Sequence, residues 1–510
     1  MENHEEAPSP VGGPWGRWLK GRRIRDRRVL VVSVAACAVL GGVLTLLPRE
    51  GEATRARAPA ARARAAVAAG APAALPDLAV LIGEREARVR ARPGDAGSWA
   101  VLGAAYVEQG RRTADPVYYP KAERALRRSL EVRGKRDAET LGGLAALANA
   151  RRDFRAALTW ARAAQQAAPG RWTTYPPLID AYTGLGDLKA ARGALGRLMK
   201  LRSGPAVLAR AAAVYRDGGR REDAAVALSD AAAGARAPAE RAAYLERAGQ
   251  LAWERGEPRV ALRYFREALR LDPDQSAAQA GQGRVLAALG RTTEALSAYR
   301  AALADQPCPQ YALELGELYE SLGLGRPARE RYDLLRARVR EAAAGGVDEE
   351  LVLGRFEADH GDARSAVRRL RAEWARQPGI AVADALGWAL HRAGEHREAL
   401  RFATLATDGV RGGGVRSAPY AFHRGMIERE LERYGPARRH LREALRINPY
   451  FSPVHARAAR AALAELGEPS LRDVPVMEVP AMEMPATDAK GVTTGCPSCP
   501  VPVRSPRTGP

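Results

Sequence analysis

The chain has 510 residues, of which 46% are hydrophobic and only 6% are aromatic. This hydrophobic content is enough for a buried core. The abundance of alanine within it favours closely packed helices over sheets. The net charge of +21 would ordinarily suggest nucleic acid or an acidic membrane as a partner. The arginines that carry this charge are spread along the whole chain, which is typical of the codon bias of a high-GC, actinobacterial-type genome. This interpretation is favoured over a polyanion-binding site.

A long apolar run near the N-terminus predicts a membrane-spanning helix. Residues 29–47, VLVVSVAACAVLGGVLTLL, contain no charged side chain. A helix of this length spans about 28 Å, close to the roughly 30 Å hydrocarbon core of a bilayer. The preceding residues 1–28 include the basic segment RWLKGRRIRDRR, which the positive-inside tendency keeps in the cytoplasm. The sequence therefore predicts a single-pass protein of the cell membrane, with the chain after the span on the extracytoplasmic side.

Two alternatives to an uncleaved signal anchor remain open. The triplet APA at 58–60 is similar to a signal-peptidase site, but it lies far beyond the apolar run. VAAC at 34–37 is similar to a bacterial lipobox and would make Cys37 a lipidated residue, although the apolar run continues well past Cys37. After the span, residues 48–77 consist largely of Ala, Arg, Pro and Gly without sustained periodicity, and a flexible stalk is expected there.

Beyond the stalk, the chain repeats one helical-hairpin pattern. A small residue in one helix is followed twelve residues later by an alanine, as in the pairs Gly249/Ala261 and Gly283/Ala295. The alanines of successive pairs lie 33 to 38 residues apart, close to the period of about 34 residues of helix-turn-helix repeats. Several second helices end at a proline, as in YFREALRLDP, because proline cannot continue a helix. We interpret each pair as a close contact between two antiparallel helices.

These residues resemble the tetratricopeptide repeat. WAVLGAAY at 99–106 and YALELGELYESLG at 311–323 carry the first-helix pattern of that family, a large residue followed by Leu-Gly and then Tyr. The resemblance covers residues 78–466. It implies an all-α fold, a right-handed α-solenoid of about ten repeats, preceded here by the one transmembrane helix. Leu78–Arg92 is expected to be a lone second helix that caps the array.

The resemblance also implies a concave surface lined by the first helix of each repeat. The matching positions give nine candidate partner-binding residues: Trp253, Arg284, Glu317, Glu320, Arg355, Trp388, His391, Phe422 and Met426. The N-terminal repeats offer mostly alanine at these positions, so a peptide groove is expected in the C-terminal half. The alternative, in which Trp253 and Trp388 pack against adjacent helices, stays open.

The sequence contains no Gly-rich phosphate loop, nucleophile elbow or HExxH motif, so we expect neither an enzyme nor a bound cofactor. The one reactive-looking motif is GCPSC, in which Cys496 and Cys499 are weak candidates for metal ligands because zinc requires two more. The motif lies in residues 467–510, a Pro-rich segment that is expected to be disordered.

The sequence thus predicts a membrane-anchored scaffold that binds partner proteins or peptides through the concave face of its repeats. The alternative is a regulatory or nucleic-acid-binding repeat protein that faces the cytoplasm, a role that the positive charge would favour. Nucleic acid is the less favoured partner because the charge is dilute.

Overall fold

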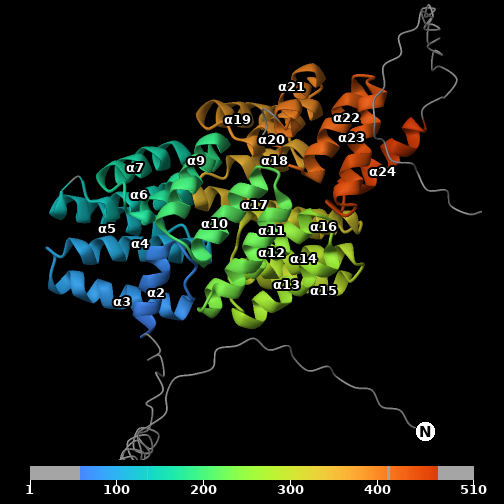
Figure 1. The fold of residues 1–510 in the computed structure, drawn as a ribbon. Coiled ribbons are helices and arrows are strands. Elements are labelled where there is room, and N and C mark those ends of the chain that lie inside the picture. The colour runs from blue at the N-terminus through green and yellow to red at the C-terminus, as the bar shows by residue number, and fades with distance from the viewer. Residues whose placement is uncertain (1–57, 135, 410–413, 469–510) are drawn as a thin grey trace, which may run out of the picture. The chain divides into compact units, whose positions relative to one another are not determined.

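Helices are the only regular elements in the part of the chain that the computed structural model describes, residues 58–134, 136–409 and 414–468. The described residues up to 465 belong to one compact unit. Within that unit the helices follow one another in chain order from α2 to α24 (Figure 1). The predicted all-α helical repeat is therefore confirmed.

Several predicted features lie outside the described residues. They are the basic segment 1–28, the predicted span 29–47 with its Cys37, and the two tail cysteines Cys496 and Cys499. Within the ranges that the structure does describe, no helix has both the length and the apolar character needed to cross a bilayer.

Ten helical hairpins form the array in the described ranges. Their first helices are α4 (Ala96–Thr113), α6 (Ala138–Ala150), α8 (Tyr175–Gly184), α10 (Pro205–Asp217), α12 (Pro238–Glu254), α14 (Ser276–Ala288), α16 (Pro309–Ser321), α18 (Glu350–His360), α20 (Ile380–Arg392) and α22 (Ala418–Glu430). Their second helices are α5 (Tyr118–Arg133), α7 (Phe154–Ala167), α9 (Leu188–Leu201), α11 (Arg221–Gly234), α13 (Pro258–Leu271), α15 (Thr292–Asp305), α17 (Gly325–Ala344), α19 (Ala363–Arg376), α21 (His396–Thr407) and α23 (Tyr434–Ile447). A short 3₁₀ helix, η1 (Trp172–Thr174), precedes α8, and α24 (His455–Leu466) follows the last hairpin.

An eleventh pair of helices, α2 (Pro59–Ala69) and α3 (Leu75–Ala91), precedes the array and corrects two predictions. The expected flexible stalk, residues 48–77, contains α2, whose Ala60 and Ala63 are buried in one apolar cluster with residues of α3 and α4. The expected lone capping helix, α3, therefore has a partner helix. The cause is propensity: alanine and arginine are strong helix formers, and they outweigh the missing periodicity.

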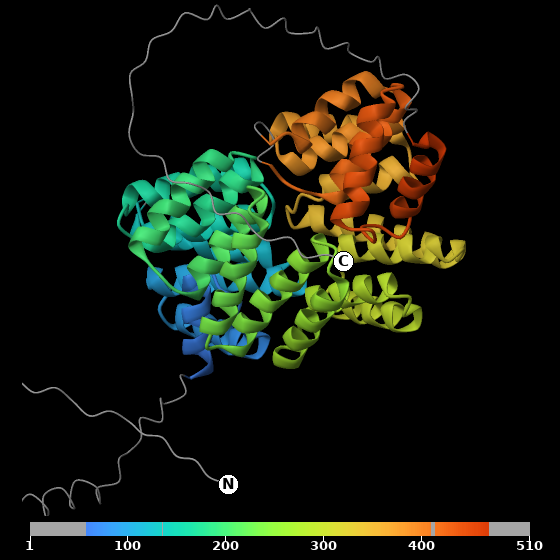
Figure 2. The same cartoon turned by 45° about the vertical axis from the view of Figure 1, so that its right-hand side comes forward.

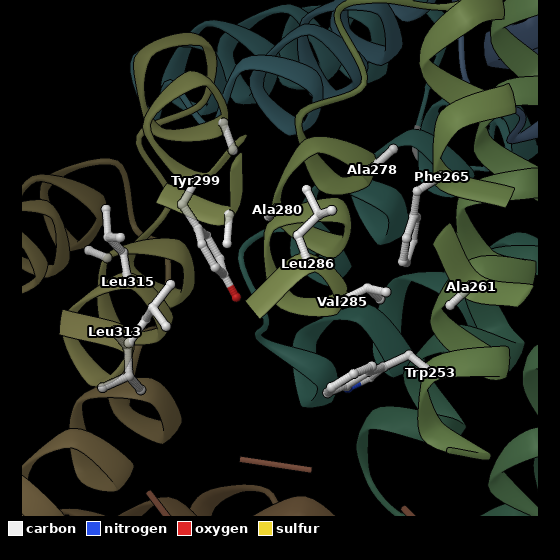
Figure 3. Packing of buried hydrophobic residues seen from close by; sticks show 14 of the residues in the cluster. Trp253, Ala261, Phe265, Ala278, Ala280, Val285, Leu286, Tyr299, Leu313 and Leu315 are labelled. Carbon is white, nitrogen blue, oxygen red and sulfur yellow. The ribbon is translucent and has the colours of Figure 1, made fainter. Parts of the chain in front are cut away.

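Phe265 on α13 shows how successive hairpins pack. Its ring is fully buried, and Cβ atoms added at Gly249 of α12 and Gly281 of α14 would lie only 2.7 and 2.5 Å from it. Glycine at both positions leaves room for the ring, which therefore joins its own hairpin to the next. Figure 3 shows the ring beside α14, near Ala278 and Val285.

A similar relationship holds within the next hairpin, where the sequence predicts that Gly283 of α14 faces Ala295 of α15. A Cβ added at Gly283 would meet the ring of Tyr299 on α15 at 2.7 Å, and Ala295, one helical turn earlier on α15, is fully buried. The glycine therefore makes room for a large ring on the partner helix.

Hairpins that are far apart in the sequence also touch. Arg112, in the last turn of α4, pairs with Asp272 at the end of α13 across 2.8 Å, with 4% and 8% of the two side chains exposed. Arg112 also donates a hydrogen bond to Gln275 across 2.8 Å. Removing either residue of such a buried pair costs stability, because it leaves an uncompensated charge in the interior.

Two further contacts of this kind follow along the chain. Gln377 Nε2 donates to the carbonyl of Arg152 across 2.8 Å, and its Oε1 accepts from the backbone N–H of Phe154 at 3.1 Å. Asn448 Nδ2 donates to the carbonyl of Trp253, also across 2.8 Å. Gly256, with φ +77°, lies in the turn beside this last contact, where an added Cβ would come within 2.6 Å of the Ile447 carbonyl oxygen. The early hairpins of the array therefore lie directly against the late ones (Figure 2).

Candidate ligand-binding cavity

A cavity of about 1010 Å³ lies among these contacts inside this compact unit. Helices from α7 to α24 contribute to its wall, so residues of the early and of the late hairpins face the same space. The volume stands at the upper end of the range of about 300–1,000 Å³ that is usual for ligand pockets. The contacts between distant hairpins thus turn the inner surface of the repeats into a cavity.

The polar part of the wall is strongly charged. Its arginines are Arg152, Arg216, Arg221, Arg284, Arg355, Arg416, Arg457 and Arg460. Its carboxylates are Asp217, Glu254, Glu314, Glu317, Asp348 and Glu373. Apolar side chains such as Phe154, Leu188, Leu351 and Ile380 lie between them. The wall therefore offers contacts to both charged and apolar groups of a ligand.

Four of the nine candidate groove residues line this cavity: Trp253, Arg284, Glu317 and Arg355. Trp253 is only 6% exposed and belongs to the largest apolar cluster, so most of its indole packs against neighbouring helices. The sequence left open whether this residue contacts a partner or a helix, and the structure places it in contact with helices and at the edge of the cavity.

Arg284 is held in a defined position on the wall. Its guanidinium makes an ion pair with Glu314 of the next hairpin at 2.8 Å and donates to Gln250 of the preceding hairpin at 2.6 Å. The hydroxyl of Tyr299 donates to the same Glu314 at 2.9 Å. Burial, together with the charge of Glu314, raises the pKa of Tyr299 well above its ordinary value, so the phenol stays protonated.

Glu317 and Glu320 are both paired with His360 of α18. His360 Nε2 lies 3.6 Å from Glu317 and Nδ1 lies 3.1 Å from Glu320, which also accepts from the hydroxyl of Tyr332 at 2.7 Å. Burial alone would lower the pKa of His360, but the hydrogen bond and charge of Glu317 and the charge of Glu320 raise it overall. Glu317 reaches the cavity wall, whereas Glu320 does not line it.

Trp388 and Phe422 lie away from this cavity, in an aromatic cluster between helices. The ring centroid of Trp388 is 4.4 Å from that of His423, 5.5 Å from that of Phe422 and 5.5 Å from that of His455. Its indole N–H donates to Asp359 across 2.9 Å. Trp388 is 5% exposed and Phe422 1%. Both residues therefore pack between helices, as the sequence alternative allows for Trp388.

His391 and Met426 complete the set of candidates. His391 is half-buried, stacks on Trp388 with ring centroids 4.9 Å apart, and places Nδ1 3.1 Å from Nδ1 of His396. Burial, with the nearby His396, lowers the pKa of His391 to about 3. Met426 on α22 is half-buried, and neither residue lines the cavity.

Sequence reasoning did not identify several cavity residues. They are Arg216, Arg221, Arg416, Tyr420, Arg457 and Arg460. Arg216 ends α10, at a first-helix position that could have been included. The others lie in turns, at helix starts or on α24, and only the contact between distant hairpins brings them to one cavity.

The described residues contain no candidate metal site. Within 58–134, 136–409 and 414–468, no group of three or more His, Cys, Asp or Glu side chains is arranged to hold an ion. Cys308, in the same part of the chain, is a free thiol.

The fold and the cavity define the class: an all-helical repeat protein with an internal charged cavity. Residues 246–307 and 282–346 match the family model described as tetratricopeptide repeat. The matched stretch includes the hairpins from α12 to α17, and the same hairpin arrangement continues on both sides of it. Residues 246–346 therefore match tetratricopeptide repeats, as the sequence predicts for this stretch.

Three solved structures are similar to this chain at low sequence identity. A human IFIT1 dimer with m7Gppp-AAAA is 16% identical, with a TM-score of 0.43, over 62% of this chain and 72% of that one. MamA is 20% identical, with a TM-score of 0.27, over 33% and 97%. A tetratricopeptide repeat protein from Parabacteroides merdae is 18% identical, with a TM-score of 0.31, over 51% and 97%. No curated protein matches the chain.

Proposed function

We propose that this protein is a membrane-anchored scaffold that binds a partner protein by taking a segment of it into the cavity, without catalysing a reaction. The observation that carries the proposal is the cavity of about 1010 Å³ with its mixed charged and apolar wall. A peptide segment presents both kinds of group, and stacked helical repeats commonly use their inner surface for binding. The match of residues 246–346 to tetratricopeptide repeats supports the same role.

Two exposed tyrosines allow a controlled test. Tyr450 lines the cavity and is 40% exposed, whereas Tyr434 is 50% exposed and lies outside the cavity. A photocrosslinking amino acid is placed at either position in the full chain, which is then irradiated in its native membrane. We expect one defined protein adduct from position 450 and none from position 434. Equal adducts at both positions, or adducts at 434 alone, would contradict binding in the cavity.

Anchoring by residues 29–47, with the repeats on the extracytoplasmic side, belongs to the same proposal. Its support is the uncharged run of that segment and the basic residues before it. A protease added to intact protoplasts should digest the repeats. Repeats that are protected until the cells are lysed would place them in the cytoplasm instead.

A further inference from the structure

Arg221 and Arg355 differ from the other arginines of the cavity wall. Four of these have a carboxylate partner: Arg152, Arg216, Arg284 and Arg416. Two donate to backbone carbonyls, Arg457 to Ser321 and Arg460 to Pro449. In the part of the chain that the structure describes, the side chains of Arg221 and Arg355 have neither an ion pair nor a hydrogen bond, and residues 410–413, Val-Arg-Gly-Gly, contain no carboxylate.

The carboxylates of the wall, in contrast, are all paired within the described residues. Glu254 pairs with Arg216 at 2.7 Å, and Asp217 lies 3.7 Å from the same arginine. Glu314 and Glu317 pair with Arg284 and His360, and Asp348 and Glu373 both pair with Arg376. Within the described residues, the cavity therefore contains two arginines, Arg221 and Arg355, that no carboxylate pairs with directly.

Arg221, at the start of α11, is in an unfavourable environment. Its Nη2 atom is buried and has no hydrogen-bond partner. Burial, with the nearby charge of Arg255, lowers the pKa of Arg221 overall, although the charge of Glu254 opposes this shift. A buried cation that lacks a partner and lies beside like charges is stabilised when an anion binds next to it.

Arg355 reaches the same region from α18. The charges of Arg355 and Arg216 both act to lower the pKa of Tyr420. The charge of Glu254 acts to raise the pKa of Arg221. Both arginines line the same cavity as the Arg216–Glu254 ion pair, one from an early hairpin and one from a late hairpin. The pair of free cations exists only because the two groups of hairpins touch.

We infer that Arg221 and Arg355 bind acidic side chains of the peptide segment that enters the cavity, so that the partner segment is acidic with apolar residues between its charges. This inference rests on the proposed function. A carboxylate matches the planar guanidinium fork, and side chains such as Leu351 and Ile380 receive the apolar residues. A uniformly anionic polymer fits less well, because it offers no apolar group to side chains such as Leu351 and Ile380.

The test selects peptides from a phage-displayed library of random twelve-residue sequences on the full chain in detergent. Acidic peptides with apolar residues between the charges are expected, and their affinity should fall as salt is raised. Replacing their Glu residues with Gln should weaken binding at least about tenfold. In the protein, the double substitution Arg221→Gln and Arg355→Gln should cause a similar loss. Arg263→Gln, on an exposed face of α13, is the matched control and should change nothing.

Each outcome decides something different. Enrichment of neutral or basic peptides, or acidic peptides that bind the double variant as well as the parent, would overturn the acidic-segment inference and leave the proposed function standing. Failure to enrich any peptide would remove the proposed function as well. Binding of a single-stranded oligonucleotide that the double variant abolishes would assign the arginines to nucleic acid and overturn the inference. If circular dichroism shows that the double variant is unfolded, the comparison of Glu and Gln peptides on the parent chain decides.

Discussion

The side-chain amide of Asn448 donates a hydrogen bond to the backbone carbonyl of Trp253 across 2.8 Å, although 195 positions separate the two residues in the sequence. Asn448 is only 2% exposed, and its Oδ1 accepts from the backbone N–H of Tyr450 at 2.9 Å. One side chain thus orders its own turn and attaches that turn to an early hairpin. Because Trp253 and Tyr450 both line the cavity, this bond also fixes two parts of its wall.

Asn448→Asp should destabilise the protein by about 1–3 kcal/mol, because it keeps the acceptor for Tyr450 but replaces the donor with an oxygen that faces a carbonyl oxygen. Urea denaturation measures the change, and hydrogen exchange should increase in both turns. Asn149→Asp is the control. Asn149 donates to the Pro177 carbonyl at 2.8 Å, within neighbouring hairpins, and is only half-buried. If hydrogen exchange increases only in the turn that contains Asn448, the distant contact does not stabilise the array.

The buried ion pair between Arg112 and Asp272 predicts a strongly asymmetric response to substitution. Arg112→Met should cost about 3–5 kcal/mol, because it leaves Asp272 buried and unpaired. Adding Asp272→Leu should recover much of that loss, which a double-substitution cycle in denaturant measures. Removing the exposed partner Arg270 from its pair with Glu267 should change little. Equal effects at both pairs would contradict close contact between these hairpins in solution.

How much of this could be read from the sequence depends on the range of the interaction. The hairpins were predictable because Gly, Ala and aromatic residues recur with a fixed spacing, and each such set, as at Phe265, specifies contact with the adjacent hairpin only. The Arg112–Asp272 contact has no such signal. It results from small rotations between hairpins that accumulate along the array, so nothing near Arg112 in the sequence indicates its partner. The same limit hid Arg221 from the list of cavity residues.

The helix α2 was missed for a different reason. Its alanines and arginines give it little apolar periodicity, so the pattern that marks the other helices is absent here. Stronger evidence was present in its ends: Pro59 stands at the first helical position, and Gly70 ends the helix with φ +64°. Proline at a helix start and glycine just past its end are the residues expected there.

Gly316 and Gly142 should respond in opposite directions to the same substitution. A Cβ at Gly316 would collide with the ring of Tyr332, so Gly316→Ala should destabilise by about 1–3 kcal/mol. Gly142, inside α6, has nothing within 4 Å of an added Cβ, so Gly142→Ala should stabilise by about 0.5–1 kcal/mol. Thermal unfolding of both variants measures the difference. Destabilisation by Gly142→Ala would show that a Cβ at position 142 does meet a neighbouring group.

His391 should make the protein less stable in mild acid. Burial and the neighbouring His396 lower its pKa from the ordinary 6.5 to about 3 in the folded chain, so between these values the unfolded state binds more protons. Stability attributable to His391 is therefore present above pH 6.5 and falls as the pH is lowered through this window, by up to about 1.4 kcal/mol per unit. His391→Phe should flatten the dependence measured by urea denaturation between pH 6.5 and 5. An unchanged slope would mean that His391 is not buried in solution.

Trp388 should matter for stability more than for binding. Its indole is 5% exposed, stacks on His423 and donates to Asp359, so Trp388→Ala removes a buried ring and should cost about 3–5 kcal/mol. Leu351→Ala is the comparison, because Leu351 is half-buried and lines the cavity. That change should lower affinity for the selected peptide with a smaller loss of stability.

Both variants are studied at a temperature at which circular dichroism shows them folded, and peptide affinity and urea midpoint are measured on the same samples. If Trp388→Ala keeps its midpoint and loses affinity, the aromatic cluster is a partner-binding surface after all. In that case the cavity is not the main site.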